Sequence, residues 1–364
     1  MASLDDLIHR TPTSPTTTFE LLTQLWSRDA SSKLDNQEID VEAYFSYHKK
    51  QCSQALHDGG RHISARTHCD ILEIAEDLEE GLSRDTIRGR LSSKLADPKP
   101  ANENELLDSS INLTARLVSM MDIGVLQYGF SGRRELVWNQ GSLKDFVNGY
   151  FNVPVVLGQD VKLEKMFNAP NLVRIAGINI VWTDNLADHL RMIDDEDKKV
   201  AIFHHASFLK CQQTYIRYSP SAHVETHKAN SNSTLFPPGL MEETLRTLAL
   251  LFPQSDKDTA KWFSKLPYSL HIDCQIVKCG HLKADDRQIE NFKFWHDRLV
   301  ILKQVFDESR PSTLSQWWCD RRNGVQWYTF WVAILILSLT IFFGMVQSIE
   351  GALQVYKAYH PTPL

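Results

Sequence analysis

The stretch Trp327–Gln347 (WYTFWVAILILSLTIFFGMVQ) decides how the rest of the chain is interpreted, because it is long and almost wholly apolar. No charged residue occurs from Asn323 to Ile349. A helix needs about 20 apolar residues to cross a bilayer. A buried core helix is the alternative, but core helices usually carry a polar face, and this stretch offers only Ser338 and Thr340 in its middle. We therefore predict one membrane-spanning helix, with these residues along it: Trp327, Trp331, Leu335, Leu339, Phe343 and Gln347.

The residues on either side of this stretch predict its orientation. Rings that favour the headgroup layer flank it at Trp317, Trp318, Trp327, Tyr328, Trp331, Tyr356 and Tyr359. One basic residue, Lys357, follows the span. Those that precede it most closely are Lys303, Arg310, Arg321 and Arg322. The positive-inside rule thus predicts a single-pass protein on an intracellular membrane, with the bulk of the chain in the cytosol.

Both ends of the sequence fit this topology. Seventeen residues follow Gln347, which predicts insertion after synthesis and a tail-anchored protein. Gly351–Tyr356 either extends the helix or lies along the far interface, and Pro361 is the expected stop. The start, Met1–Asp6, has no basic leader and no apolar run, so we expect no secretory signal.

The composition predicts a folded, mildly acidic protein. Charged residues make up 23% of the sequence and hydrophobic residues 43%, fractions typical of folded soluble domains. The net charge of −6 belongs to the part before the span, because Glu350 and Lys357 cancel after it. We therefore expect no nucleic-acid partner. The six cysteines are scattered, and a cytosolic location keeps them reduced.

Helical periodicity before the span predicts a mainly α-helical domain with a minor β component. Apolar residues recur at spacings of three and four in 19–26, 41–55, 71–82, 83–95, 105–121, 240–251 and 292–306. Ser83 is the expected cap of one of these helices. Two β-branched runs, 153–157 and 175–182, predict a small sheet. The charge run 194–199 and the polar stretch 219–238 are expected to be loops.

These patterns predict six segments. They are a flexible arm (1–18), an N-terminal helical region (19–97), a main globular region that is mostly helical with a small sheet (98–310), a juxtamembrane segment (311–326), the transmembrane helix (327–347) and a short tail (348–364).

One cluster of side chains resembles a metal site. His271, Cys274, Cys279 and His281 put two imidazoles and two thiols within eleven residues, and zinc takes four such ligands. The spacing is not that of a standard zinc knuckle. If 272–277 were a strand, the two cysteines would face opposite sides of it. We therefore predict reduced structural cysteines and no metal site, and keep these four residues only as candidate ligands.

His281 is also a candidate catalytic base. His281 and Asp286 have the His-x4-Asp spacing of membrane-associated acyltransferases, in which the imidazole deprotonates a hydroxyl and the carboxylate orients the imidazole. Fourteen histidines produce about one such match by chance. The adjacent pair His204 and His205 is expected to be buried and hydrogen-bonded. No dinucleotide-binding or phosphate-binding glycine motif occurs, so we predict no cofactor.

Four segments carry a resemblance to known sequences. They are Ala115–Gly124, Gln316–Asn323, Gln326–Trp331 and Ile349–Tyr356. The last three resemble the C-terminal segment of a group of uncharacterised filamentous-fungal single-pass membrane proteins, and Ala115–Gly124 is similar to another part of that group. The resemblance implies a fungal source and a membrane anchor, and it suggests an association with specialised-metabolite genes. It transfers no catalytic residue.

Three hypotheses about function remain open. The first is a non-enzymatic anchoring or interaction protein whose partners are the lipid bilayer and other proteins. The second is a membrane-associated enzyme or accessory protein of a fungal specialised-metabolite pathway, with acyl transfer as the reaction and His281 as the base. The third is self-association in the membrane, suggested by the apolar stripe 292–306 and by Gly344 in the span.

Overall fold

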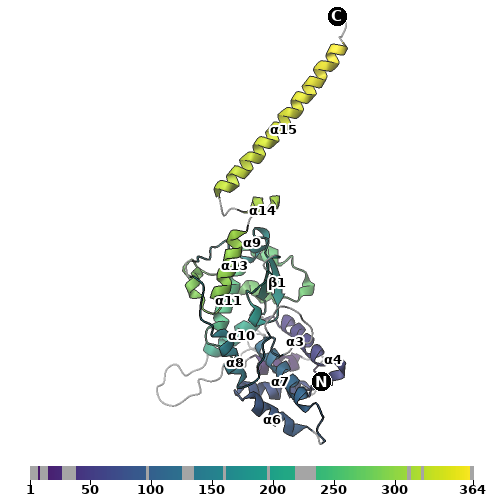
Figure 1. The fold of residues 1–364 in the computed structure, drawn as a ribbon, viewed down its shortest axis with the longest axis vertical. Coiled ribbons are helices and arrows are strands. Elements are labelled where there is room, and N and C mark those ends of the chain that lie inside the picture. Colours follow the sequence, from purple (N-terminus) through teal and green to yellow (C-terminus); the bar gives the residue numbers. More distant parts are fainter. Residues whose placement is uncertain are drawn as a thin grey trace. The chain divides into compact units, whose positions relative to one another are not determined.

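The computed structural model describes residues 7–8, 15–26, 38–95, 98–124, 135–158, 161–194, 197–217, 235–309, 313–320 and 324–360 (Figure 1). The chain divides into two compact units. The large unit comprises residues 1–173 and 178–308, and the small unit comprises 174–177 and 309–364. Helices dominate the described residues, which also contain one three-stranded sheet. The predicted fold class is therefore confirmed.

The first part of the large unit is a group of helices. They are α1 (Pro15–Leu25), α3 (Glu42–Ala55), α4 (His57–Gly60), α5 (His68–Glu79), α6 (Arg84–Lys94), α7 (Glu103–Ser119) and α8 (Leu143–Phe151). Helix α7 packs against α3, α5 and α6. Most of its side chains from Leu107 to Ser119 are buried. Because α7 follows the predicted boundary at residue 97 and packs against helices that precede it, the two regions belong to one unit.

Local signals in the sequence account for several helix ends. Ser83 accepts a hydrogen bond from the Thr86 backbone N–H and caps α6, as predicted. A capping box formed by Thr67 and Asp70 starts α5. The predicted arm is wrong at its end, because α1 begins at Pro15, and proline favours the first position of a helix. Ile8 is also buried, and its N–H donates to the Arg66 carbonyl.

The sheet lies in the middle of the large unit's sequence. Strand β1 (Asn179–Thr183) pairs in parallel with β3 (Lys199–Phe203), and β2 (Met192–Asp194) pairs antiparallel on the other edge of β3. The β-branched run 175–182 therefore forms a strand only from residue 179. The charge run 194–199, predicted as a loop, instead contributes its first and last residues to β2 and β3.

The other predicted strand, 153–157, is wrong. These residues form no strand, and Val153 and Val156 are 65% and 78% exposed. The backbone N–H groups of Val156 and Leu157 donate to the Asp297 carboxylate at 3.1 and 3.2 Å. A side chain thus takes the place that a neighbouring strand would need, so β propensity alone did not decide the structure.

The other described helices of the large unit are α-helices and short 3-10 helices, the latter labelled η. They are α9 (Ala169–Arg174, whose last residue is assigned to the small unit), η1 (Leu186–Asp188), α10 (Ala206–Arg217), α11 (Leu240–Leu251), α12 (Lys257–Phe263), η2 (Tyr268–Leu270), η3 (Cys274–Lys278), η4 (Asp285–Arg287), η5 (Ile289–Asn291) and α13 (His296–Glu308). Most of the predicted loop 219–238 falls outside the described residues.

Helix α13 begins later than the periodicity predicts. Phe292 and Trp295 are buried as expected, but the helix starts only at His296. The carboxylate of Glu243, on α11, accepts hydrogen bonds from the backbone N–H groups of Lys293, Phe294 and Trp295, each at 2.8 Å. These N–H groups precede the first turn of the helix. The long-range contact with Glu243 therefore fixes the entry to α13.

Two buried histidines in the large unit are held neutral. The Nε2 of His189 lies 2.7 Å from the Thr247 hydroxyl, and its Nδ1 accepts from the Phe203 N–H at 3.2 Å. Burial, with the charge of Arg298, lowers the pKa of His189 to about 3. Burial, with His68, likewise lowers the pKa of His48 to about 3.

We expect acid to destabilise the fold through these two groups. An unfolded histidine binds a proton near pH 6.5, whereas the folded ones do so only near pH 3, so the unfolded state gains protons first as the pH falls. Each histidine should lower the free energy of unfolding by about 1.4 kcal/mol per pH unit below 6.5. Urea titrations of the full chain in detergent at pH 7, 5.5 and 4.5 measure this. His189→Gln should flatten the pH dependence, and an unchanged slope in that variant would contradict the assignment.

Candidate functional site

Helix α15 (Gly324–Tyr359) has the properties of a membrane span (Figure 1). Within Trp327–Tyr359 an 18-residue window has a mean hydropathy of 2.3, and none of that window is buried. A core helix of a soluble protein would be covered by other parts of the chain, whereas Leu335 and Phe343 are more than half exposed. The structure thus favours the predicted span over the core-helix alternative. The helix also continues past Gln347 to Tyr359 without a break.

The hydroxyl groups of the apolar part of α15 are paired within the helix itself. The hydroxyls of Ser338, Thr340 and Ser348 donate to the carbonyls of Ile334, Ile336 and Gly344, each at 2.8 Å. The hydrocarbon layer contains no water to bind such groups, so internal pairing is what a spanning helix requires. The three hydroxyls between Val332 and Ile349 therefore do not oppose insertion.

An aromatic cluster forms where α15 begins. Short helix α14 (Leu314–Cys319) starts with a capping box between Thr313 and Gln316. The Trp317 ring stacks on Phe330 at 4.6 Å between centroids, and the Trp318 ring meets Trp331 edge-on at 4.8 Å. Indole rings prefer the membrane interface. Helix α14 and the first turns of α15 thus form one aromatic surface suited to the headgroup layer.

The four candidate zinc ligands do not come together. The segment is not a strand but contains the turn η3, and His271 adopts a left-handed backbone conformation (φ 45°). The His271 ring lies 3.7 Å from the Glu42 carboxylate, and the Cys279 thiol donates to the Gln275 carbonyl. Among the described residues, no three of the four donor atoms form a cluster of metal-binding size. The four residues are close in sequence, but their donor atoms are not close together in space.

The predicted pair His281 and Asp286 also lacks the geometry of a catalytic dyad. His281 is exposed. The Asp286 carboxylate accepts a hydrogen bond from the Lys283 backbone N–H at 3.1 Å. No hydrogen bond or ion pair joins the two side chains in the part of the chain that the structure describes.

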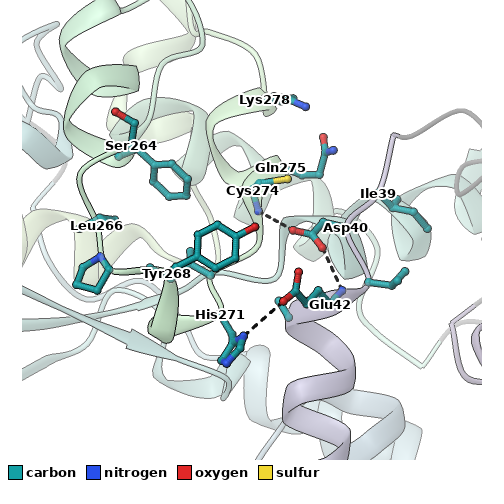
Figure 2. Close-up of a pocket in the computed structure, with 15 residues that line it drawn as sticks. Ile39, Asp40, Glu42, Ser264, Leu266, Tyr268, His271, Cys274, Gln275 and Lys278 are labelled. Carbon is teal, nitrogen blue, oxygen red and sulfur yellow. Dashed lines mark hydrogen bonds and ion pairs between the residues drawn. The ribbon is translucent and has the colours of Figure 1, made fainter. Parts of the chain in front are cut away.

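A pocket of about 650 Å³ lies between the start of α3 and residues 263–278 (Figure 2). Asp40, Glu42 and His271 line its polar side. Its apolar side is formed by Phe263, Leu266, Pro267 and Tyr268. The Asp40 carboxylate already accepts from the backbone N–H groups of Cys274, at 3.1 Å, and Glu42, at 3.0 Å. Asp40 therefore joins the two walls of the pocket, which is a structural role.

Asp273 reinforces the same junction. It is buried, and its carboxylate accepts from the backbone N–H groups of Ser207, at 2.6 Å, and Gln275, at 2.8 Å. Burial raises its pKa to about 6, against the effect of these hydrogen bonds. The Ser207 hydroxyl in turn accepts from the Asp40 N–H at 2.7 Å. The two aspartates thus tie the start of α3 and the start of α10 to η3.

A second cluster lies at the carboxyl ends of the parallel strands. Thr183 pairs with Phe203 at the end of β1 and β3, so the next residues, Asp184 and His204, emerge at the same edge. Asp184 Oδ1 lies 2.8 Å from Nε2 of His205 and 3.3 Å from Nε2 of His204. The two imidazole rings stack with centroids 4.0 Å apart.

The electrostatics of this cluster follow from burial. The side chains of His204 and His205 are 5% and 2% exposed, and that of Asp184 is 29% exposed. Burial opposes the charge of Asp184, but hydrogen bonds to the two histidines outweigh it and hold the pKa of Asp184 well below its usual range. Burial, with the neighbouring His204, lowers the pKa of His205 to about 4. Lys50 on α3 approaches the other carboxylate oxygen at 3.7 Å.

Sequence reasoning found two of the three residues of this cluster. It predicted that His204 and His205 are buried and hydrogen-bonded, but it did not connect them with Asp184. A signal was available in the sequence, because Asp184 and His204 each directly follow a run that contains β-branched residues. Functional side chains gather at the carboxyl ends of parallel strands. No protein-family model, curated protein or solved structure matches this chain.

Proposed function

We propose that this protein is a single-pass membrane protein in which α15 anchors the large unit to an intracellular membrane, and that it acts there as a non-enzymatic anchoring or interaction protein. The observation that carries the proposal is the exposed, apolar α15 with its internally paired hydroxyls. Its first partner is the lipid bilayer, and the large unit would present its surface to protein partners.

The orientation rests on the basic residues around the span. Lys303 and three arginines precede α15, and Lys357 is the one basic residue within or after it. Under the positive-inside rule this asymmetry supports a cytosolic large unit. The resemblance of the C-terminal segments to fungal membrane proteins supports both a fungal origin and the membrane anchor.

The enzymatic alternative receives less support from the geometry. Acyl transfer by His281 would need a partner to orient its imidazole, and Asp286 is hydrogen-bonded to Lys283 instead. The pocket at Asp40 has carboxylate oxygens committed to backbone N–H groups. Among the described residues, no hydrogen bond joins His281 or His271 to a serine, threonine or cysteine side chain that could act as a nucleophile.

Proximity labelling from the N-terminus tests the proposal. The labelling enzyme is fused to the intact chain, to a chain ending at Arg322, and to a chain in which an unrelated span of equal length replaces α15. We expect the intact chain and the exchanged-span chain to label membrane-bound cytosolic neighbours that the truncated chain misses. If the truncated chain labels the same proteins as the intact one, or if the intact chain labels lumenal proteins, the proposed anchoring or orientation is wrong.

A further inference from the structure

The cluster at the carboxyl ends of β1 and β3 contains two imidazole nitrogens and one carboxylate oxygen. Asp184 directly follows β1, and His204 and His205 lie between the end of β3 and the start of α10. All three donor atoms lie within 4.8 Å of one another. Two histidines and one carboxylate are a ligand set that suits divalent zinc, iron, cobalt or manganese.

The spacing of the donor atoms matches that of ligands around one ion. Zinc lies about 2.0–2.2 Å from nitrogen and oxygen ligands, which places neighbouring donors roughly 3.0–3.5 Å apart at tetrahedral or octahedral angles. The Asp184 Oδ1 to Nε2 distances of 2.8 and 3.3 Å are close to that range. Small outward shifts of the carboxylate would admit an ion between the three atoms.

The surroundings provide both support and access. The two imidazoles are almost fully buried and fixed by packing, with His205 against the rings of Tyr47 and Phe203. The Asp184 side chain is 29% exposed, so an ion could enter and further ligands could approach from its side. We propose that Asp184, His204 and His205 bind one divalent first-row transition metal ion.

Two contacts compete with the ion. The Lys50 ammonium, 3.7 Å from Asp184 Oδ2, adds positive charge beside the site, but its side chain is 61% exposed and can move into solvent. The Asp273 backbone N–H donates to Nδ1 of His204 at 3.5 Å, which favours the proton on Nε2. Metal binding moves that proton to Nδ1 and breaks this long contact.

The test uses the full chain in detergent micelles, stripped of metal with a chelator and titrated with cobalt(II), followed by displacement with zinc(II). We expect one ion per chain, with an absorption spectrum of nitrogen and oxygen ligation rather than thiolate ligation. Asp184→Asn, which keeps the shape of the side chain, should weaken binding at least tenfold. Asp194→Asn makes the same chemical change on β2 and should leave binding unchanged.

Two more variants make the result decisive. Lys50→Met keeps all three ligands and removes the competing charge, so it should bind cobalt more tightly than the unaltered chain, and it decides the question if Asp184→Asn does not fold by circular dichroism. Cys274→Ser removes a thiol that lines the pocket near Asp40, and it should bind cobalt as the unaltered chain does. Uptake of less than half an ion per folded chain, equal affinity in a folded Asp184→Asn variant, weaker binding in Lys50→Met, or a thiolate spectrum lost in Cys274→Ser would each overturn the proposal.

Discussion

Replacing both Leu335 and Leu339 by arginine is expected to release the protein from membranes. Both side chains are exposed on α15, 59% and 46%, and lie near the middle of the span. An arginine at the centre of a spanning helix costs about 2.5–3.5 kcal/mol on insertion scales, so two should cost roughly 5–7 kcal/mol. That is sufficient to oppose insertion of a single helix of this hydropathy.

Extraction of membranes at alkaline pH measures the effect. The unaltered chain should remain in the pellet, and the double variant should appear in the soluble fraction or aggregate outside membranes. The matched control places two arginines at the ends of α15, as Val325→Arg and Tyr359→Arg, where long side chains reach the headgroup layer. A double variant at Leu335 and Leu339 that resists extraction as well as this control would show that α15 does not span the bilayer.

Trp295→Ala is expected to cause the largest loss of stability from a single substitution in the large unit. Trp295 is 1% exposed, its ring meets His189 edge-on at 4.9 Å, and its indole N–H donates to the Thr244 hydroxyl at 2.9 Å. Removing a buried tryptophan side chain leaves a cavity and typically costs about 3–5 kcal/mol. The variant also leaves the Thr244 hydroxyl without its donor.

Urea unfolding of the full chain in mild detergent, followed by far-ultraviolet circular dichroism, gives the change in the free energy of unfolding. Tyr268→Ala is the matched control, because Tyr268 is an aromatic residue of the same unit that is 88% exposed. We expect that control to change stability by less than about 0.5 kcal/mol. Similar losses in the two variants would mean that the packing around Trp295 does not stabilise the fold.

The sequence predicted the features that depend on local pattern. The apolar run that forms α15, the periodicity of α7 and the cap at Ser83 all agree with the structure, because each is decided by residues a few positions apart. The late start of α13 was not predictable in this way. It depends on Glu243, about fifty residues earlier in the chain.

The candidate sites show the same difference between features set by local sequence and features set by long-range contacts. His271 and His281 are close in sequence, and their spacing suggested that their donor atoms would meet. The η3 segment and the left-handed backbone conformation of His271 keep these donor atoms apart. Asp184 and His204 are twenty residues apart and meet because β1 and β3 pair in parallel with a particular register. Strand partners and register are properties of the whole sheet, so a local motif search cannot find that cluster.

The position of the aromatic cluster on α15 sets the thickness of membrane that the helix matches. If the rings around Trp331 lie at the headgroup level, the uncharged, mostly apolar part from Val332 to Ile349 is about 27 Å long at 1.5 Å per residue. This equals the hydrocarbon thickness of the endoplasmic reticulum, about 27 Å, and falls short of the plasma membrane at about 32–33 Å. In the thicker bilayer, either the lipid must thin or the indole rings must enter the hydrocarbon. Hydrophobic mismatch would therefore favour a thin membrane for a spanning helix of this length.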